Sequence, residues 1–189
     1  MDCCVALFYV HTFREEGKRV LSICCLIAIL GIAAYEDITS LKVSNRIICT
    51  GWCLGFLSNI FSTDLFTGSI NWIKGIIIPI CILFLLYIFK MLGAGDIKLI
   101  SVIGGFFGSV FALKVFVVSI FIGGMWAVIK CVRYGYLYIR IIYFKKYLAE
   151  FIRSKKINPY YVRERDGDEI VIPFSAAIFA GYVIVEFIF

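Results

Sequence analysis

Six blocks of apolar residues, most of them long enough to cross a lipid bilayer, limit how this chain can fold more than any other feature. A bilayer core takes about 20 consecutive apolar residues per helix. The chain is 62% hydrophobic, against about 45–50% in ordinary globular domains. The sequence therefore predicts an all-α polytopic membrane protein. The expected spans are Val20–Tyr35, Arg46–Phe61, Ile70–Phe89, Ile97–Leu113, Val115–Val132 and Ile170–Phe189.

The chain shows no internal repeat and no break in composition, which predicts a single membrane-embedded domain, residues 1–189, folded as a six-transmembrane-helix bundle. Residues 1–19 begin with an apolar stretch too short to cross a bilayer, and no signal-peptide cleavage pattern follows it. We expect an interfacial or disordered lead-in there. We also expect a short turn near Lys114 between the fourth and fifth spans, and close helix packing at Gly104 and Gly108.

The Lys and Arg residues concentrate in the loop 133–169, whereas the loop 61–69 has none. Cytoplasmic loops of membrane proteins carry the excess of basic residues, so we expect the loop 133–169 in the cytoplasm. Its cations would bind an anionic inner leaflet, each contributing about 1 kcal/mol. The net charge of +6 is then mainly a topology signal. No nucleic-acid-binding module accompanies the basic residues, which argues against nucleic acid as a partner.

The eight cysteines and the single histidine do not predict a metal centre. None of the cysteines forms the paired CxxC clusters that bind zinc. Cysteine in an apolar helix behaves as a small hydrophobic residue. We therefore expect no metal and no cofactor.

Two acidic residues, Asp37 and Asp96, lie at the ends of apolar spans. An ionised acid at the bilayer centre costs at least about 2.5 kcal/mol, so such residues tend to face a polar cavity and to have a function. Asp37 ends the first span and Asp96 begins the fourth. Because consecutive spans alternate in direction, both acids are expected at the same membrane face. A helix bundle can bring them together from different helices.

Two carboxyl groups in contact provide a known form of acid–base chemistry. Like charges a few ångströms apart cannot both ionise easily, so the pair shares one proton. The ionised member can take a proton from a water molecule that attacks a peptide carbonyl, while the protonated member donates to the developing oxyanion or leaving amine. Gly93 and Gly95 precede Asp96. Their lack of side chains would let the backbone bend or approach a substrate strand closely.

The stretch "GAGDIKL" at Gly93–Leu99, together with Asp37, resembles the GxGD aspartyl proteases and specifically the type IV prepilin peptidase family. Two further blocks match: "LKVSNRI" after Asp37, and "IPFSAAIFAGYV" before the end of the chain. The resemblance implies that Asp37 and Asp96 are catalytic, near the cytoplasmic face of the cytoplasmic membrane. It also implies that the substrates are prepilins or pseudopilins, from which a short basic leader is removed.

The chain lacks the extra cytoplasmic domain with paired CxxC motifs that the larger, methylating members of the family carry. It looks like the short, peptidase-only form associated with Flp/Tad-type pili. Ser44 stands where the family commonly has proline before the asparagine at Asn45. An archaeal preflagellin peptidase is a close relative and remains an alternative. If the leader is basic, the acids near the end of the loop 133–169 are candidate contacts for it: Glu164, Asp166, Asp168 and Glu169.

Two other classes compete with the peptidase. Carboxylates inside membranes also serve proton or cation transport, but the sequence has no inverted repeat and no pair of broken spans. A noncatalytic assembly protein could keep the bundle without the activity. The presence of both aspartates favours the enzyme.

Overall fold

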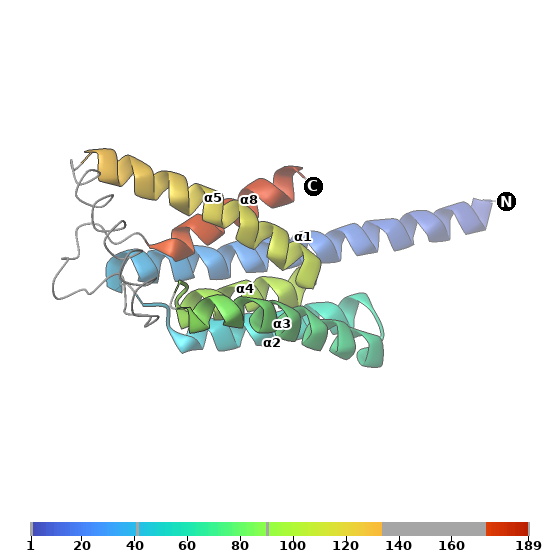
Figure 1. The fold of residues 1–189 in the computed structure, drawn as a ribbon. Coiled ribbons are helices and arrows are strands. Elements are labelled where there is room, and N and C mark those ends of the chain that lie inside the picture. Colours follow the sequence, from blue (N-terminus) through green and yellow to red (C-terminus); the bar gives the residue numbers. More distant parts are fainter. Residues whose placement is uncertain (1, 41, 90, 134–172, 189) are drawn as a thin grey trace.

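The computed structural model describes residues 2–40, 42–89, 91–133 and 173–188, with the side chains of 2–15 and 131 left aside. Within these residues the chain forms six helices and no strand, in agreement with the predicted all-α class. Figure 1 shows the arrangement. The helices are α1 (Asp2–Ser40), α2 (Asn45–Ser62), α3 (Leu65–Ile88), α4 (Ala94–Phe107), α5 (Ser109–Arg133) and α8 (Phe174–Ile188).

Three stretches of the described residues are long and apolar enough to cross a membrane: Glu16–Ser40 in α1, Leu65–Ile88, which is all of α3, and Ser109–Lys130 in α5. The helix α4 has 14 residues and α8 has 15. At 1.5 Å per residue these two helices are about 21 and about 22 Å long, shorter than the hydrocarbon core of about 30 Å. Each of the six predicted spans thus overlaps a helix, but among the described residues only three helices have spanning length and hydropathy.

The break between α4 and α5 differs from the prediction, and the start of the chain is helical. Residues 2–19 form the first part of α1, which runs without interruption from Asp2 to Ser40, and this part projects past the other helices (Figure 1). Charged residues such as Glu, Lys and Arg are good helix formers, so they extend the helix. The turn expected near Lys114 lies instead at Gly108, whose φ of 87° ends α4. Few residues other than glycine adopt that conformation readily.

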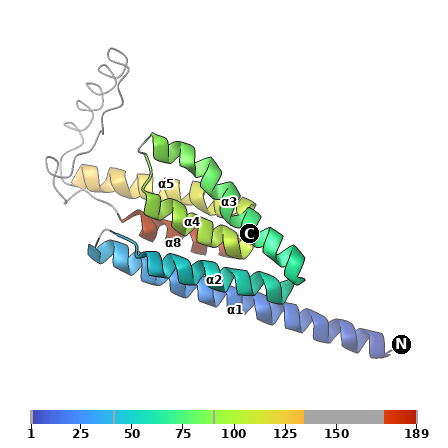
Figure 2. The same ribbon diagram turned by 90° about the horizontal axis from the view of Figure 1, so that it is seen from below.

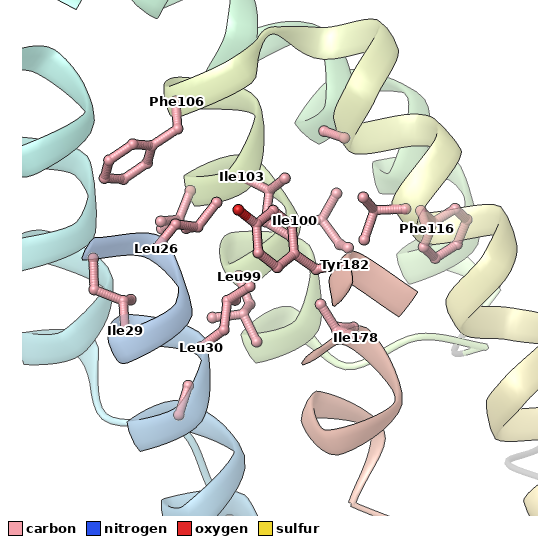
Figure 3. Close-up of a cluster of buried hydrophobic side chains, with 14 of the residues drawn as sticks. Leu26, Ile29, Leu30, Leu99, Ile100, Ile103, Phe106, Phe116, Ile178 and Tyr182 are labelled. Carbon is pink, nitrogen blue, oxygen red and sulfur yellow. The ribbon is translucent and has the colours of Figure 1, made fainter. Parts of the chain in front are cut away.

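The helix α4 lies at the centre of the bundle and contacts every other described helix. From Ile97 to Phe106 every residue of α4 is buried except Lys98, which is partly exposed. A helix that is apolar on nearly all sides belongs in a protein interior. Figure 3 shows Leu26 and Leu30 of α1, Leu99 and Ile103 of α4 and the ring of Tyr182 of α8 meeting in this core.

The helices α3 and α4 approach closely at a pair of glycines. A Cβ atom added to Gly75 would collide with the carbonyl oxygen of Gly104, and one added to Gly104 would collide with the carbonyl oxygen of Gly75. Small residues at such crossings let helix backbones pack at short range in a membrane. The predicted packing role is therefore seen at Gly104. At Gly108 it is not, because a Cβ there would meet nothing within 4 Å.

Polar side chains link α2 to α3 and α4. Trp52 donates its indole N–H to Ser101 Oγ (3.1 Å), and Trp72 donates to the carbonyl oxygen of Trp52 (3.0 Å). The Asn59 amide donates to the carbonyl oxygen of Gly105 (2.7 Å). These bonds satisfy polar groups that would otherwise be costly in an apolar interior. In both ribbon views α2 also lies alongside α1, while α3 crosses at an angle (Figure 2).

Candidate functional site

The two aspartates and the start of α8 lie at one end of the bundle. Asp37 is near the last turn of α1, Asp96 is in the first turn of α4, and α8 begins at Phe174. Figure 1 shows these three helix ends together, and Figure 2 shows the same grouping from below. The helices that contribute them are remote in sequence. This end of the bundle is therefore assembled by tertiary packing alone.

The Asp37 carboxyl group is buried, with 9% of the residue exposed. Its Oδ2 accepts a hydrogen bond from the main-chain N–H of Ser175 (3.1 Å). Ser175 is the second residue of α8, and the first N–H groups of a helix have no partner within the helix. A helix N-terminus also attracts negative charge. The N-terminus of α8 is therefore a binding site for the Asp37 carboxylate.

Asp96 precedes the buried run of α4 and lies outside the three spanning stretches. Burial, and secondly the negative charge of Asp37, raise the pKa of Asp96 from 3.8 to about 7, while a main-chain hydrogen bond at Gly93 acts in the opposite direction. The two predicted acids thus lie at the same end of the bundle, and Asp37 is near enough to Asp96 for its charge to raise that pKa. That they form one catalytic site stays a prediction.

The glycines before Asp96 have different surroundings. Gly93 precedes α4 in an ordinary extended conformation. A Cβ on it would lie 2.9 Å from Oδ2 of Asp96, so a side chain would displace the carboxyl group. A Cβ on Gly95 would meet only Val43, at 4.0 Å. No bend requires either glycine, since Gly108 has the only positive φ among the glycines of the described residues.

The turn between α1 and α2 is tied to the same end of the bundle. Glu36 Oε2 accepts the main-chain N–H of Ser44 (2.8 Å), and Ser44 Oγ caps α2 by accepting the N–H of Arg46 (3.3 Å). Serine at a helix N-cap supplies such a bond, whereas proline would not. Lys98 donates to Asn45 Oδ1 (3.0 Å) and so links α4 to the start of α2.

The remaining predicted contacts are outside the described residues. The candidate leader-binding acids Glu164, Asp166, Asp168 and Glu169 fall in the segment 134–172, as does almost all of the basic loop. In the part of the chain that the structure describes, no group of three or more His, Cys, Asp or Glu residues could hold a metal ion. The described cysteines there are free thiols: Cys24, Cys25, Cys49, Cys53 and Cys81.

Ser175 is the residue of the site that the sequence analysis missed. Its bond to Asp37 uses the main-chain N–H, which any residue except proline would supply, so this bond leaves no side-chain signal in the sequence. The usable signal is Pro173 directly before α8. Proline favours the first residues of a helix and so marks a place where unpaired N–H groups follow. A buried carboxylate elsewhere in the chain needs such donors.

Comparison with known proteins assigns the chain to a family. Its helices of spanning length and high hydropathy are those of a membrane protein. The model of the type IV leader peptidase family matches residues 24–128, more than half of the chain, including both aspartates but not α8. The chain belongs to the type IV leader peptidase family; it is a protease, and its family implies prepilin-type substrates. The searches of curated proteins and of solved structures gave no match.

Proposed function

We propose that this protein is an aspartic endopeptidase that removes the short basic leader from type IV or Flp-type prepilins, with Asp37 and Asp96 as its catalytic pair. The observation that carries the proposal is the buried Asp37 carboxyl group, held by the α8 N-terminus while its charge acts on Asp96. Two coupled acids in a buried site hold one proton between them near neutral pH. Such a pair can activate water and protonate the substrate without a metal or a covalent intermediate.

The distribution of basic residues supports a cytoplasmic position for the site. The end of the bundle that holds the aspartates also holds the end of α5 and the starts of α2 and α4. Basic residues favour the cytoplasmic side of a membrane protein. A prepilin leader, which is basic and cytoplasmic in this proposal, would reach the pair from that side. The Lys and Arg residues near these helix ends are Lys42, Arg46, Lys98, Lys130 and Arg133.

The test is to express the protein together with prepilin-type proteins from the same genome and to follow leader loss by mass spectrometry. Asp37→Asn and Asp96→Asn should each abolish leader removal, because either change removes the ability to share a proton. Both variants should still enter the membrane. Asp64→Asn is the matched control, since Asp64 is exposed next to α3 and its side chain makes no capping bond. Complete processing by either Asp37→Asn or Asp96→Asn would refute the proposal.

A further inference from the structure

The two aspartates have unequal surroundings, and the difference comes from α8. We propose that Ser175 is a positioning residue of the aspartate pair: its N–H holds Asp37 as the ionised base, its hydroxyl orients the attacking water, and Asp96 carries the proton. This inference rests on the proposed two-aspartate function. It adds to that function an assignment of roles and a third element of the site, on a helix that the family match does not reach.

The first argument is the hydrogen bond to Asp37. An N–H that donates to a carboxylate stabilises the ionised form more than the neutral one, and such charge-assisted bonds are about twice as strong as neutral ones. Ser175 donates from the first turn of α8, where the helix dipole adds a partial positive charge. Asp96 has no comparable donor from another helix among the described residues, and its only main-chain bond is local, at Gly93.

The second argument is the Ser175 hydroxyl group. Ser175 is completely buried, and its Oγ has no hydrogen-bond partner among the described residues. Two other buried serines behave differently, because Ser101 and Ser119 donate to carbonyl oxygens of their own helices. Leaving a buried hydroxyl unpaired costs about 1–3 kcal/mol. A structure tolerates that cost where a group is reserved for a ligand or a water molecule.

The position of this hydroxyl is close to Asp37. Only three covalent bonds separate Ser175 Oγ from the Ser175 nitrogen, and that nitrogen is 3.1 Å from Asp37 Oδ2. One water molecule can therefore reach both the carboxylate and the hydroxyl. A buried water needs two to four polar partners. Asp37 and Ser175 supply two of them, and the carbonyl group of a bound substrate would supply a third.

The third argument is that α8 is held in place firmly enough to position these groups. A Cβ on Gly181 would collide with Ser119 Oγ, so α8 packs directly on α5. At the start of α8, a Cβ on Gly123 of α5 would lie 3.2 Å from the Phe174 ring. Tyr182 is fully buried in the core shown in Figure 3. These contacts hold α8 in place at Phe174, one residue before Ser175, and at Gly181 and Tyr182, about two turns after it.

The reaction then balances with no further reagent. Asp37 takes a proton from water as the water oxygen bonds to the carbonyl carbon of the scissile peptide, and Asp96 gives its proton to the carbonyl oxygen. The carbon–nitrogen bond next breaks. The proton on Asp37 passes to the leaving amine, and one hydroxyl proton of the tetrahedral intermediate returns to Asp96. The products are a carboxylic acid and an amine, and both aspartates regain their starting states.

The hydroxyl is tested by Ser175→Ala in the full-length protein in nanodiscs, assayed with a purified prepilin. This change keeps the N–H and removes the hydroxyl, so kcat should fall by up to about 100- to 1,000-fold, the range seen when one oriented oxyanion-hole donor is lost. KM should stay unchanged, and Ser175→Thr should recover part of the rate. Ser119→Ala is the matched control, because it also removes a buried hydroxyl but one that bonds only to its own helix. A wild-type kcat in Ser175→Ala would overturn the role of the hydroxyl.

The N–H is tested by replacing Ser175 with its α-hydroxy acid analogue, which turns the amide into an ester and keeps the side chain. Loss of the donor should lower kcat and leave KM unchanged, because the N–H positions the Asp37 carboxyl group and does not bind the substrate. An ester at Ala177, inside α8, is the control and should leave kcat unchanged. A wild-type kcat in the Ser175 ester would overturn the role of the N–H. Cleavage by Asp37→Asn, by contrast, would remove the proposed function itself.

Discussion

Raising the pH above 7 should inactivate the enzyme by removing the proton from Asp96. Burial and the charge of Asp37 place the pKa of Asp96 at about 7, so about nine-tenths of the enzyme carries this proton at pH 6 and about one-tenth at pH 8. If Asp96 is the acid, kcat/KM falls about tenfold for each pH unit above 7. An ordinary aspartate, with a pKa of 3.8, would keep the proton in only about one molecule in a thousand at pH 7.

The assay is the initial rate of leader release in nanodiscs between pH 5 and 9, at constant ionic strength and at substrate concentrations well below KM. Enzyme held at pH 9 and returned to pH 6.5 should recover its full rate, which separates a lost proton from irreversible unfolding. The substrate is checked by measuring its own cleavage by an unrelated protease over the same range. A rate that stays constant from pH 6 to pH 9, or that falls with a midpoint near 4, would refute the reasoning.

Two further predictions concern stability. Wild type should lose stability as pH rises from about 4 to 7, because the raised pKa of Asp96 lets the folded state bind an extra proton that is lost over this range. Asp96→Asn should weaken this loss of unfolding temperature; a wild-type unfolding temperature that rises over the same range would contradict the prediction. Gly75→Ala should destabilise the fold by about 1–3 kcal/mol, because the new Cβ collides with the Gly104 carbonyl oxygen. In the control Gly31→Ala the new Cβ meets nothing within 4 Å, so the change should be neutral or stabilising by up to about 1 kcal/mol. Equal unfolding temperatures of the two variants would argue against the close α3–α4 contact.

The helices could be predicted from the sequence because apolar runs of this length have few other stable structures in a membrane. The break between α4 and α5 could not. The sequence is apolar on both sides of Gly108, and Lys114, the nearest charge, suggested a turn six residues too late. The positive φ of Gly108 is set by how α4 and α5 pack, and one glycine in an apolar stretch does not by itself predict a helix break.

Counting the spans predicted one feature of the candidate site, namely that Asp37 and Asp96 lie at the same membrane face. Because helices alternate in direction, the end of the first and the start of the fourth fall on the same side, and this brought Asp37 and Asp96 into consideration. The bond from Ser175 to Asp37 joins residues 138 positions apart and uses a main-chain atom. A long-range bond from a main-chain atom cannot be predicted from the pattern or spacing of side chains. Gly93 and Gly95 were predicted to allow a bend or the close approach of a substrate strand; the backbone makes no such bend, and the close approach stays a prediction.

Helix dipoles alone would give the two aspartates the opposite roles. Asp96 lies in the first turn of α4, where a negative charge is favoured, and Asp37 lies near the last turn of α1, where it is disfavoured. Burial reverses the first preference, because desolvation is the largest influence on the pKa of Asp96 and raises it despite the local hydrogen bond at Gly93. The N-terminus of α8 opposes the second, because it brings a main-chain N–H to Asp37 from outside α1. In the proposed mechanism the asymmetry between the two aspartates therefore arises from which helix ends meet, and it requires no difference between the two side chains.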